Sequence, residues 1–235
     1  MIAIVLAGGL GTRLRSVVVD VPKPLAPIAG KPFLHYFLQR LAKFNCEKMI
    51  LSVGYKAELI REAIGKNFQG IPVSYSIEQA PLGTGGAIKK ALQSLGDIDQ
   101  SILILNGDTY FDLDLTAFLQ FHQRGKFDLS IALREVADVT RSGVVTLQHN
   151  RVICFQEKSA SGKGWINAGA YPLSPTIIDR VKALPEQVFS WEERVLAPLV
   201  NSHQVGGFCA TGHFIDIGVP EDYQRAQTLL PGWTK

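Results

Sequence analysis

Glycines and one arginine stand close together near the start of the sequence, in a pattern that could bind phosphate. The segment Ala7 to Leu14 holds Gly8, Gly9, Gly11 and Arg13, and it directly follows a short apolar run. Glycines let the backbone approach a ligand closely, and the exposed N–H groups of such a turn can cradle a phosphate. Arginine adds a permanently charged bidentate donor. The segment indicates a phosphate-binding loop, although a glycine turn without a ligand would have the same composition.

The spacing of these glycines excludes two common nucleotide-binding patterns. It does not match GxGxxG, the dinucleotide fingerprint, and no Lys-Ser/Thr pair follows as in the P-loop. Lys23 instead comes ten residues after Arg13, between Pro22 and Pro24. Proline restricts its own φ and favours an extended conformation in the residue before it, so Lys23 is positioned rather than mobile. Taken alone, a surface lysine in a proline-rich loop is the simpler interpretation.

Two aspartates follow or lie within apolar runs and could hold a metal ion. Asp108 comes shortly after the run Ser101 to Leu105, and Asp216 lies inside Phe214 to Ile217. Magnesium prefers one or two carboxylates together with phosphate oxygens, so Asp108 at the end of a strand beside a phosphate loop fits such a site. A buried carboxylate is costly without a partner, so Asp216 needs a cation or a hydrogen-bond donor. A carboxylate bonded only to backbone N–H groups is the alternative.

A second glycine-rich segment, Glu78 to Ala87, stands between a strand-like and a helix-like stretch. Gln79 offers both a donor and an acceptor to the edge of a base, and glycines such as Gly83 permit close approach of a flat ring. The N-terminus of the following helix adds a partial positive charge. The segment predicts a base-binding turn, with a simple helix-starting turn as the alternative.

Together these segments resemble the signature of the sugar-phosphate nucleotidyltransferases: Gly-Gly-x-Gly-Thr-Arg-Leu, then Pro-Lys-Pro-Leu, then Gly-Lys-Pro. The resemblance extends from Met1 to about Gln227. It implies that Arg13 and Lys23 bind the triphosphate and stabilise charge during transfer, and that Asp108 and Asp216 bind Mg²⁺. By the same resemblance, the nucleotide-binding residues are Leu6, Ala7, Gly8, Gly9, Gly11, Thr12, Arg13, Lys23, Gln79, Gly83 and Asp108, with Arg13, Lys23 and Asp108 as the catalytic set.

The resemblance also places a sugar-phosphate site in the second half of the chain. Lys158 would meet the sugar phosphate, and Glu157 and Asn167 would hydrogen-bond to sugar hydroxyls, with Gly169 beside them. Ser159 stands where the family usually has proline. The residues that would select the sugar therefore lie in the part of the chain that is least like the rest of the family.

The reaction that the resemblance implies is attack by a sugar 1-phosphate on a nucleoside triphosphate, giving a nucleotide-diphospho-sugar and pyrophosphate. The run from Pro81 to Lys89 and the run from Phe214 to Tyr223 are most similar to the D-glycero-α-D-manno-heptose 1-phosphate guanylyltransferases. This group favours GTP as the nucleotide and a role in lipopolysaccharide or capsule synthesis. Mannose 1-phosphate with GTP and N-acetylmuramate 1-phosphate with UTP are the alternatives within the class.

Two other classes of function are open to test. A non-catalytic nucleotide-sugar sensor on the same fold would be expected to lack the charged residues of the site, and all four of Arg13, Lys23, Asp108 and Asp216 are present. A dinucleotide-dependent oxidoreductase requires the glycine spacing excluded above. It also requires an acidic residue after the second strand, where Val53-Gly54-Tyr55 stands instead.

The elements that must position these residues alternate between strand and helix in the first half of the chain. This order predicts an α/β, Rossmann-like (GT-A-type) fold with a mainly parallel sheet flanked by helices. Strands are expected at 2–6, 49–53, 73–77, 101–105 and 129–133, and helices at 32–44, 57–68, 84–95 and 115–122. After these we expect a hairpin of 144–147 with 152–156, strands at 165–171 and 214–217, and helices at 191–200 and 220–229. We expect one domain, residues 1–235, with a nucleotide-binding part at 1–135 and a small β-rich, sugar-phosphate-binding part at 136–235.

Composition excludes several other classes of protein. The chain has 235 residues, 46% of them hydrophobic and 19% charged, and a net charge of +3 with scattered basic residues, which does not indicate nucleic-acid binding. Its three cysteines are far apart, which argues against a disulfide framework or a zinc site. We find no signal peptide and no membrane-spanning run, so a cytoplasmic enzyme is the expectation. A homo-oligomer is compatible with the sequence, which fixes neither the base nor the sugar.

Overall fold

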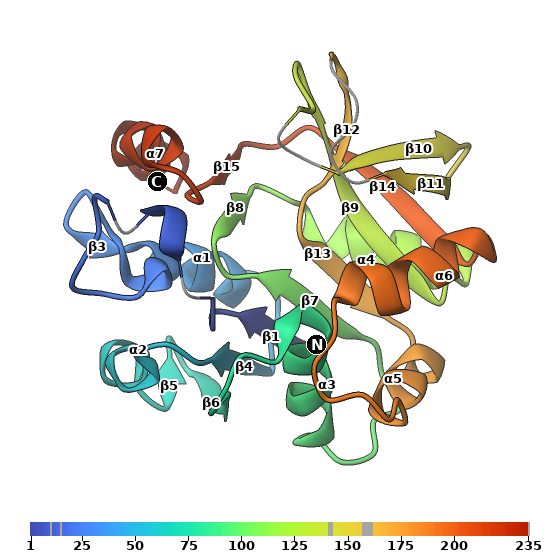
Figure 1. The fold of residues 1–235 in the computed structure, drawn as a ribbon, viewed down its shortest axis with the longest axis horizontal. Helices are drawn as coiled ribbons and strands as arrows, with labels where there is room; N and C mark the ends of the chain where they lie inside the picture. Colours follow the sequence, from blue (N-terminus) through green and yellow to red (C-terminus); the bar gives the residue numbers. More distant parts are fainter. Residues whose placement is uncertain (10, 15, 141–142, 157–161, 235) are drawn as a thin grey trace. The chain divides into compact units, whose positions relative to one another are not determined.

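The computed structural model describes residues 1–9, 11–14, 16–140, 143–156 and 162–234. It divides into two compact units, each made of separate stretches of chain. The first unit contains 1–81, 105–111 and 213–235, and the second contains 82–104 and 112–212. Figure 1 labels the elements of both.

The first unit is a parallel sheet with helices (Figure 1). Strands β1, β4 and β6 pair in parallel, and β5 closes the edge by pairing antiparallel with β6. Strand β7 begins in the second unit and ends in the first. The strands are β1 (Ile2–Leu6), β2 (Pro27–Ile28), β3 (Lys31–Pro32), β4 (Lys48–Val53), β5 (Asn67–Phe68), β6 (Ile71–Ile77), β7 (Ile102–Asn106), β8 (Thr109–Phe111) and β15 (Phe214–Asp216). The helices are α1 (Phe33–Ala42), α2 (Ala57–Ile64) and α7 (Pro220–Trp233), with short 3₁₀ turns η1 (Thr12–Leu14) and η2 (Lys23–Leu25).

The central strands β1 and β4 are mainly apolar and therefore largely buried, and their register places Val5 opposite Leu51. A separate core cluster packs around η1, α1 and α7, and it supports the short strands β8 and β15. It contains Leu14, Val18, Ala26, Ile28, Phe33, Tyr36, Tyr110, Ile215, Ile217, Tyr223, Ala226 and Leu230. Hydrophobic packing therefore anchors every segment that carries a predicted catalytic or metal-binding residue in this unit.

The second unit is built mainly from antiparallel pairs. Its strands are β9 (Leu129–Val136), β10 (Val144–Gln148), β11 (Arg151–Gln156), β12 (Gly164–Asn167), β13 (Ala170–Leu173) and β14 (Val205–Ala210), ordered β12-β10-β11-β14-β9-β13. Of these pairs, β14 with β9 is parallel. Its helices are α3 (Gly83–Gln93), α4 (Leu115–Gly125), α5 (Pro175–Lys182), the π-helical turn η3 (Glu192–Leu196) and α6 (Ala197–Asn201).

Two expected elements were wrong in detail, and several short elements were not expected. The helix expected to reach Phe68 ends at Gly65, whose φ is +73°, and Asn67–Phe68 forms strand β5. The strand expected over 165–171 is broken at Gly169, also with φ +73°. Positive φ is accessible to glycine at little cost, and it interrupts both regular elements. Helix α5 and the strands β2, β3, β8 and β14 were not expected.

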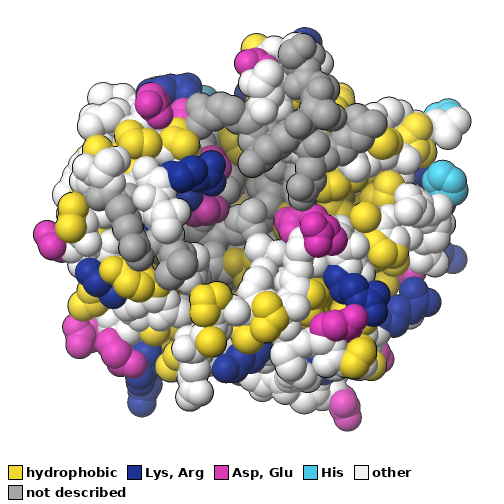
Figure 2. Space-filling model, in the orientation of Figure 1, with side chains coloured by type: hydrophobic (Ala, Val, Ile, Leu, Met, Phe, Trp, Pro, Cys, Tyr) yellow, Lys and Arg dark blue, Asp and Glu magenta, His cyan; other side chains and the backbone are white. Residues whose placement is uncertain are grey.

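None of the helices in the described part of the chain is long and apolar enough to cross a membrane. Figure 2 shows basic and acidic side chains interspersed on the viewed face.

Candidate active site

The glycine-rich loop begins where three strand ends meet. The Ala7 N–H donates to the carbonyl of Ser52 at 2.7 Å, and the Gly107 N–H donates to the carbonyl of Leu6 at 2.9 Å. These bonds tie the ends of β1, β4 and β7 together within the first unit. Ligands of open α/β sheets bind at this edge, beyond the carboxyl ends of the strands.

Gly8 is required by close packing in this loop. A Cβ at this position would lie 2.6 Å from Oε1 of Glu78 and 3.2 Å from the backbone nitrogen of Gly54. By contrast, a Cβ on Gly9 would meet no atom within 4 Å. Glycine at position 8 therefore serves the fold, while the open space above Gly9 leaves room for a ligand.

Arg13 lies on the 3₁₀ turn η1 and is exposed, whereas its neighbour Leu14 is buried in the core. Among the described residues, no carboxylate pairs with Arg13 in a salt bridge. Thr12 beside it is also exposed. The turn thus anchors its apolar residue and presents the two polar ones to solvent, where an anionic ligand can reach them.

Lys23 contacts both predicted metal-binding carboxylates. Its Nζ lies 2.7 Å from Oδ2 of Asp108 and 3.5 Å from Oδ1 of Asp216. The lysine side chain is 10% exposed, while the two carboxylates are 40% and 48% exposed. Pro22 and Pro24 on either side are buried, which fixes the backbone from which this side chain extends. Lys23 is therefore the positioned lysine that the proline pattern predicts.

A small antiparallel pair of strands brings the two aspartates together across 108 residues of sequence. Strands β8 and β15 pair with Asp216 opposite Thr109, and the Ile217 N–H donates to the carbonyl of Asp108 at 3.1 Å. Tyr110 and Ile215 on these strands belong to the buried core cluster. Because their apolar neighbours are fixed in the core, the carboxylates are held at the surface within reach of Lys23.

Neighbouring groups shift the pKa of Asp216 in opposite directions. Burial and the nearby carboxylate of Asp108 raise the pKa of Asp216, while the Lys23 ammonium and the Gly218 N–H act to lower it, and the net effect is a raised pKa. The Gly218 N–H donates to Oδ1 of Asp216 at 2.7 Å. Both a cation and a backbone donor therefore compensate this carboxylate, as its position in an apolar strand requires.

The two carboxylates suit a hard cation that keeps most of its bound waters. No group of three or more His, Cys, Asp or Glu side chains in the described ranges could hold a metal ion. The pair Asp108 and Asp216 alone fits magnesium, which keeps several waters and uses one or two carboxylates plus phosphate oxygens. It does not fit a structural zinc site, which needs four protein ligands.

Glu78, which the sequence analysis passed over, lies against the glycine loop, and its neighbour Gln79 is exposed. The Ser52 hydroxyl donates to Oε1 of Glu78 at 3.4 Å, and the Glu78 N–H donates to the carbonyl of Val53 at 2.7 Å. The sequence signal for Glu78 was a carboxylate that directly follows a strand at the edge of a predicted nucleotide site. Such a group needs hydrogen-bond donors when it is buried.

In the second unit, a neighbouring chain segment caps the N-terminus of α3. The Gly85 N–H donates to the carbonyl of Phe189 at 3.0 Å, and the Phe189 N–H donates to the carbonyl of Leu82 at 3.0 Å. A Cβ on Gly85 would lie 2.2 Å from the Phe189 ring, and one on Gly83 would lie 2.6 Å from its carbonyl oxygen. These glycines therefore have a structural reason to be small, apart from any base.

Buried Lys89 fixes the same capping segment. Lys89 is 2% exposed, and its Nζ donates to the carbonyls of Leu184 at 2.5 Å and Glu186 at 3.0 Å. Buried ammonium groups require such partners, so this lysine ties α3 to the chain that covers its N-terminus.

The predicted sugar-phosphate residues are described only in part. Glu157 and Lys158 lie outside the described residues. The Asn167 side chain donates to the Tyr171 hydroxyl at 2.6 Å and accepts from the Gly169 N–H at 3.0 Å, so it stabilises the turn between β12 and β13. This turn holds its own donor and acceptor, and its role toward a sugar stays a prediction.

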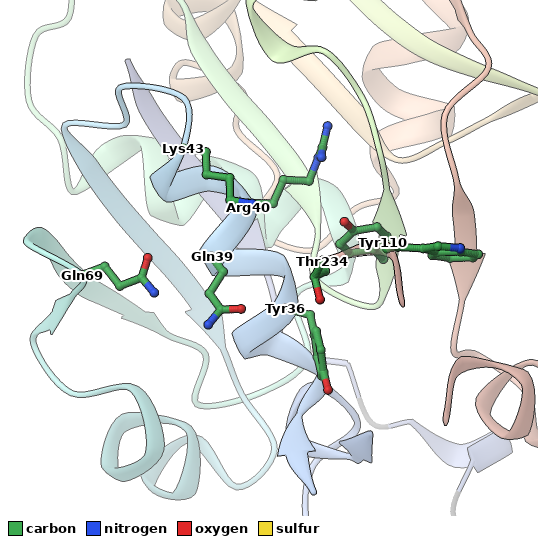
Figure 3. Close-up of a pocket in the computed structure, with 8 residues that line it drawn as sticks. Tyr36, Gln39, Arg40, Lys43, Gln69, Tyr110 and Thr234 are labelled. Atoms are coloured by element: carbon green, nitrogen blue, oxygen red, sulfur yellow. The ribbon is translucent and has the colours of Figure 1, made fainter. Parts of the chain in front are cut away.

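A separate pocket of about 250 Å³ lies in the first unit, and Figure 3 shows the side chains that line it. Its wall combines Arg40 of α1 and Lys43 directly after that helix with two tyrosines and Trp233 of α7. The lining residues are Tyr36, Gln39, Arg40, Lys43, Gln69, Tyr110, Trp233 and Thr234. None of the predicted substrate-binding residues lines it, so its cations are distinct from the Lys23 cluster.

Known proteins match this chain over nearly its whole length. The model of the Nucleotidyl transferase family matches residues 2–231. A D-glycero-alpha-D-manno-heptose 1-phosphate guanylyltransferase of Aneurinibacillus thermoaerophilus is 45% identical over 230 residues, which is 98% of each chain. A protein of the same name from Campylobacter jejuni is 42% identical, covering 95% of this chain and 97% of the relative.

A solved structure also matches, that of HddC from Yersinia pseudotuberculosis complexed with GMP-PN. It is 39% identical and has a TM-score of 0.83, with 96% of this chain and 97% of that chain covered. This likeness confirms the α/β nucleotidyltransferase fold that the sequence predicts, and the relatives confirm the enzyme class. The chain belongs to the nucleotidyl transferase family.

Proposed function

We infer that the protein transfers GMP from GTP to D-glycero-α-D-manno-heptose 1-phosphate, releasing pyrophosphate and forming the GDP-linked heptose. The observation that carries this proposal is the cluster of Lys23, Asp108 and Asp216 beside the glycine loop. The choice of nucleotide and sugar follows the two relatives named as heptose 1-phosphate guanylyltransferases, which this chain matches end to end. We also propose a cytoplasmic location, because the relatives are enzymes of sugar-nucleotide synthesis.

The chemistry requires charge neutralisation more than proton transfer. An oxygen of the sugar phosphate attacks the α-phosphorus, the bond from that phosphorus to the bridging oxygen breaks, and pyrophosphate leaves with the bonding electrons. A phosphate oxygen is already ionised at neutral pH, so no general base is needed. Lys23 and Arg13 hold the triphosphate and balance the charge that develops on the leaving group.

Enzymes of this family generally use a divalent metal ion. We propose that Asp108 and Asp216 hold Mg²⁺, which would supply Lewis-acid stabilisation of the phosphate oxygens when bound. The pairing of β8 with β15 would hold both carboxylates within reach of one ion.

Glu78 provides a physical basis for choosing guanine. Guanine presents two adjacent donors, N1–H and the exocyclic amine, and an ionised carboxylate can accept both. Adenine and uracil do not offer this pair. We propose that Glu78 accepts these bonds, with Gln79 and Gly83 as the other nucleotide residues that the sequence predicts.

A pyrophosphate-release screen tests the function. Each of the four common nucleoside triphosphates is paired with heptose, mannose, glucose and N-acetylmuramate 1-phosphates, and kcat/KM is compared. We expect the highest value for GTP with the heptose phosphate. If kcat/KM is highest for mannose 1-phosphate, or for UTP with N-acetylmuramate 1-phosphate, that pair is the substrate and the proposed heptose phosphate is wrong. Nucleotide binding without release for any pair would instead identify a non-catalytic sensor.

A further inference from the structure

Lys23 occupies an unusual position among the three charged groups of the site. It is the most buried of the three, and both carboxylates converge on its single ammonium group. Three of the four carboxylate oxygens already accept hydrogen bonds. Asp108 Oδ2 accepts from Lys23, Asp108 Oδ1 accepts from the Thr109 hydroxyl at 3.2 Å, and Asp216 Oδ1 accepts from Gly218.

Two glycines make the space for this lysine. A Cβ on Gly11 would lie 3.0 Å from the Cβ of Lys23, and a Cβ on Gly218 would lie 3.3 Å from its Nζ. Gly11 has a φ of +60°, a conformation that suits glycine, and Gly218 is buried. The stem and the end of Lys23 are thus both closely packed, so the ammonium is built into the carboxylate pair and is not a chance surface contact.

We propose that the Lys23 ammonium competes with the divalent metal ion for Asp108 and Asp216, so that tight metal binding requires the nucleotide to draw Lys23 onto its phosphates. The inference rests on the proposed function, because it takes these carboxylates as metal ligands. It assigns Lys23 a second role, that of coupling metal binding to nucleotide binding.

The physical reason is that two cations cannot share the same oxygens at low cost. A magnesium ion binds oxygen at about 2.0–2.1 Å, so an ion held by both carboxylates would lie close to the Lys23 ammonium that they already contact, and the two positive charges would repel each other. A triphosphate supplies anionic oxygens for the displaced ammonium. Without the nucleotide, the carboxylates keep their lysine and hold the metal weakly.

Direct measurement of Mn²⁺ binding tests this, with Mn²⁺ as a spectroscopic probe for the metal. Free Mn²⁺ is followed by electron paramagnetic resonance as it is added to the wild type, Lys23→Met and Lys23→Arg. Each is measured alone and with a guanosine triphosphate analogue that carries a methylene bridge between its α- and β-phosphorus atoms. Lys66→Met, which removes an exposed lysine elsewhere in the first unit, is the matched control.

For the nucleotide-free protein we expect Lys23→Met to lower the Kd for Mn²⁺ by about tenfold or more, since it removes a competing charge. Lys23→Arg and Lys66→Met should resemble the wild type. The analogue should strengthen Mn²⁺ binding far more in the wild type than in Lys23→Met. An unchanged or weaker Mn²⁺ affinity in a folded Lys23→Met protein would overturn the proposal, and Lys23→Gln repeats the test if Lys23→Met does not fold.

A second set of variants separates this inference from the proposed function. Adding Asp108→Asn or Asp216→Asn to Lys23→Met should remove the gained affinity; a gain that persists places the ion elsewhere and also overturns the proposal. Pyrophosphate release by the wild type is measured in parallel. Turnover with no effect of Lys23→Met on Mn²⁺ affinity would reject the competition alone, whereas gained affinity without turnover of any substrate pair would reject the proposed function alone.

Discussion

At the scale of single residues, the site uses the same carboxylates for two purposes. Asp108 and Asp216 form ion pairs with Lys23, the lysine that we propose binds phosphate, and they are the proposed ligands of the metal. Their side chains are nearly half exposed, so the ion pairs with Lys23 are screened by solvent and contribute little to stability. The arrangement is therefore suited to exchange of partners during catalysis, and its loss should affect turnover more than folding.

We expect Asp108→Ala to keep the fold and to lose nearly all activity. Removing one carboxylate from the metal-binding pair should lower kcat by roughly a thousandfold, as loss of a preorganised electrostatic group does in other enzymes. The rate is measured by pyrophosphate release with excess Mg²⁺, and circular dichroism checks the fold. Asp112→Asn, a nearby carboxylate outside the Lys23 cluster, is the control. Normal turnover by Asp108→Ala would disprove the metal assignment.

Glu78→Gln should relax the preference for GTP over the other nucleotides. The amide keeps the size of the side chain but offers one acceptor oxygen in place of a carboxylate, and a hydrogen bond to a charged group is worth about 1.5–3 kcal/mol. We expect kcat/KM for GTP relative to UTP and ATP to fall by about tenfold or more.

The companion variant Gln79→Ala decides between the two neighbours. If Gln79→Ala changes nucleotide preference and Glu78→Gln does not, the sequence-based assignment is right and the role proposed here for Glu78 is wrong. Both variants should unfold at the same urea concentration as the wild type, since neither side chain is fully buried.

These residues illustrate how far the sequence alone could go. The sequence assigns the base contact to Gln79, but successive residues in an extended segment point to opposite sides, so the sequence does not show which of Glu78 and Gln79 turns toward the loop. In the structure the Glu78 carboxylate lies against Gly8, and the two variants above test which side chain contacts the base. The restricted backbone positions of Lys23 and Asp108 were predictable, because prolines flank the lysine and a strand ends shortly before the aspartate. The contact between them depends on strand pairing across the chain.

At the scale of elements, the segment 83–86 shows why glycine patterns are ambiguous. The sequence suggests room for a base and a free helix N-terminus, yet the carbonyl of Phe189 accepts from the Gly85 N–H and the Phe189 ring fills the space beside it. The Thr84 hydroxyl is also engaged, since it accepts from the Trp191 N–H at 3.0 Å and donates to Glu192 at 3.1 Å. The covering segment 184–192 lies a hundred residues away, so local sequence could not reveal it.

Gly85→Ala should therefore destabilise the protein even though alanine favours helices. The added methyl group would lie 2.2 Å from the Phe189 ring, and overpacking of this kind costs about 1–3 kcal/mol. Urea unfolding measures the loss. Gly232→Ala in α7, where a Cβ meets nothing within 4 Å, is the control and should stabilise by up to about 1 kcal/mol.

A double variant tests the cause of that loss. Phe189→Ala removes the ring that the new methyl group meets, so Gly85→Ala should cost less in this background than in the wild type. Equal costs in both backgrounds would mean that the Phe189 ring is not what excludes a larger residue at position 85.

At the scale of the whole molecule, the chain order and the spatial order differ. The alternation of strands and helices was enough to predict the α/β class, and β1 begins and ends where it was expected. The division at residue 135 into nucleotide and sugar parts stays a functional prediction. The compact units are instead assembled from separate stretches, and 213–235 returns to the first unit with Asp216. The return of the chain to the first unit depends on the packing of residues such as Ile215 and Tyr223 in its core. Local sequence patterns do not show such long-range packing.

The global stability should depend on pH through one buried histidine. His122 on α4 is 2% exposed, and its Nδ1 lies 3.0 Å from the hydroxyl of buried Ser130. Burial lowers the pKa of His122 to about 4, from 6.5 for an exposed histidine. The folded protein thus keeps this ring neutral in a range where the unfolded chain protonates it.

The sign of the effect follows from proton uptake. As pH falls below 6.5 the unfolded state binds a proton that the folded state does not bind until about pH 4, so acid favours unfolding. Between pH 7.5 and pH 4.5, His122 should lower the free energy of unfolding by about 2–3 kcal/mol. His122→Gln, which cannot protonate but can still hydrogen-bond to Ser130, should lack this part of the loss. Urea unfolding at both pH values measures it, with the exposed histidine variant His203→Asn as the control. If the wild type and His122→Gln lose stability equally on acidification while His203→Asn does not, the acid sensitivity belongs to the exposed histidine and the neutral, buried state of His122 has no part in it.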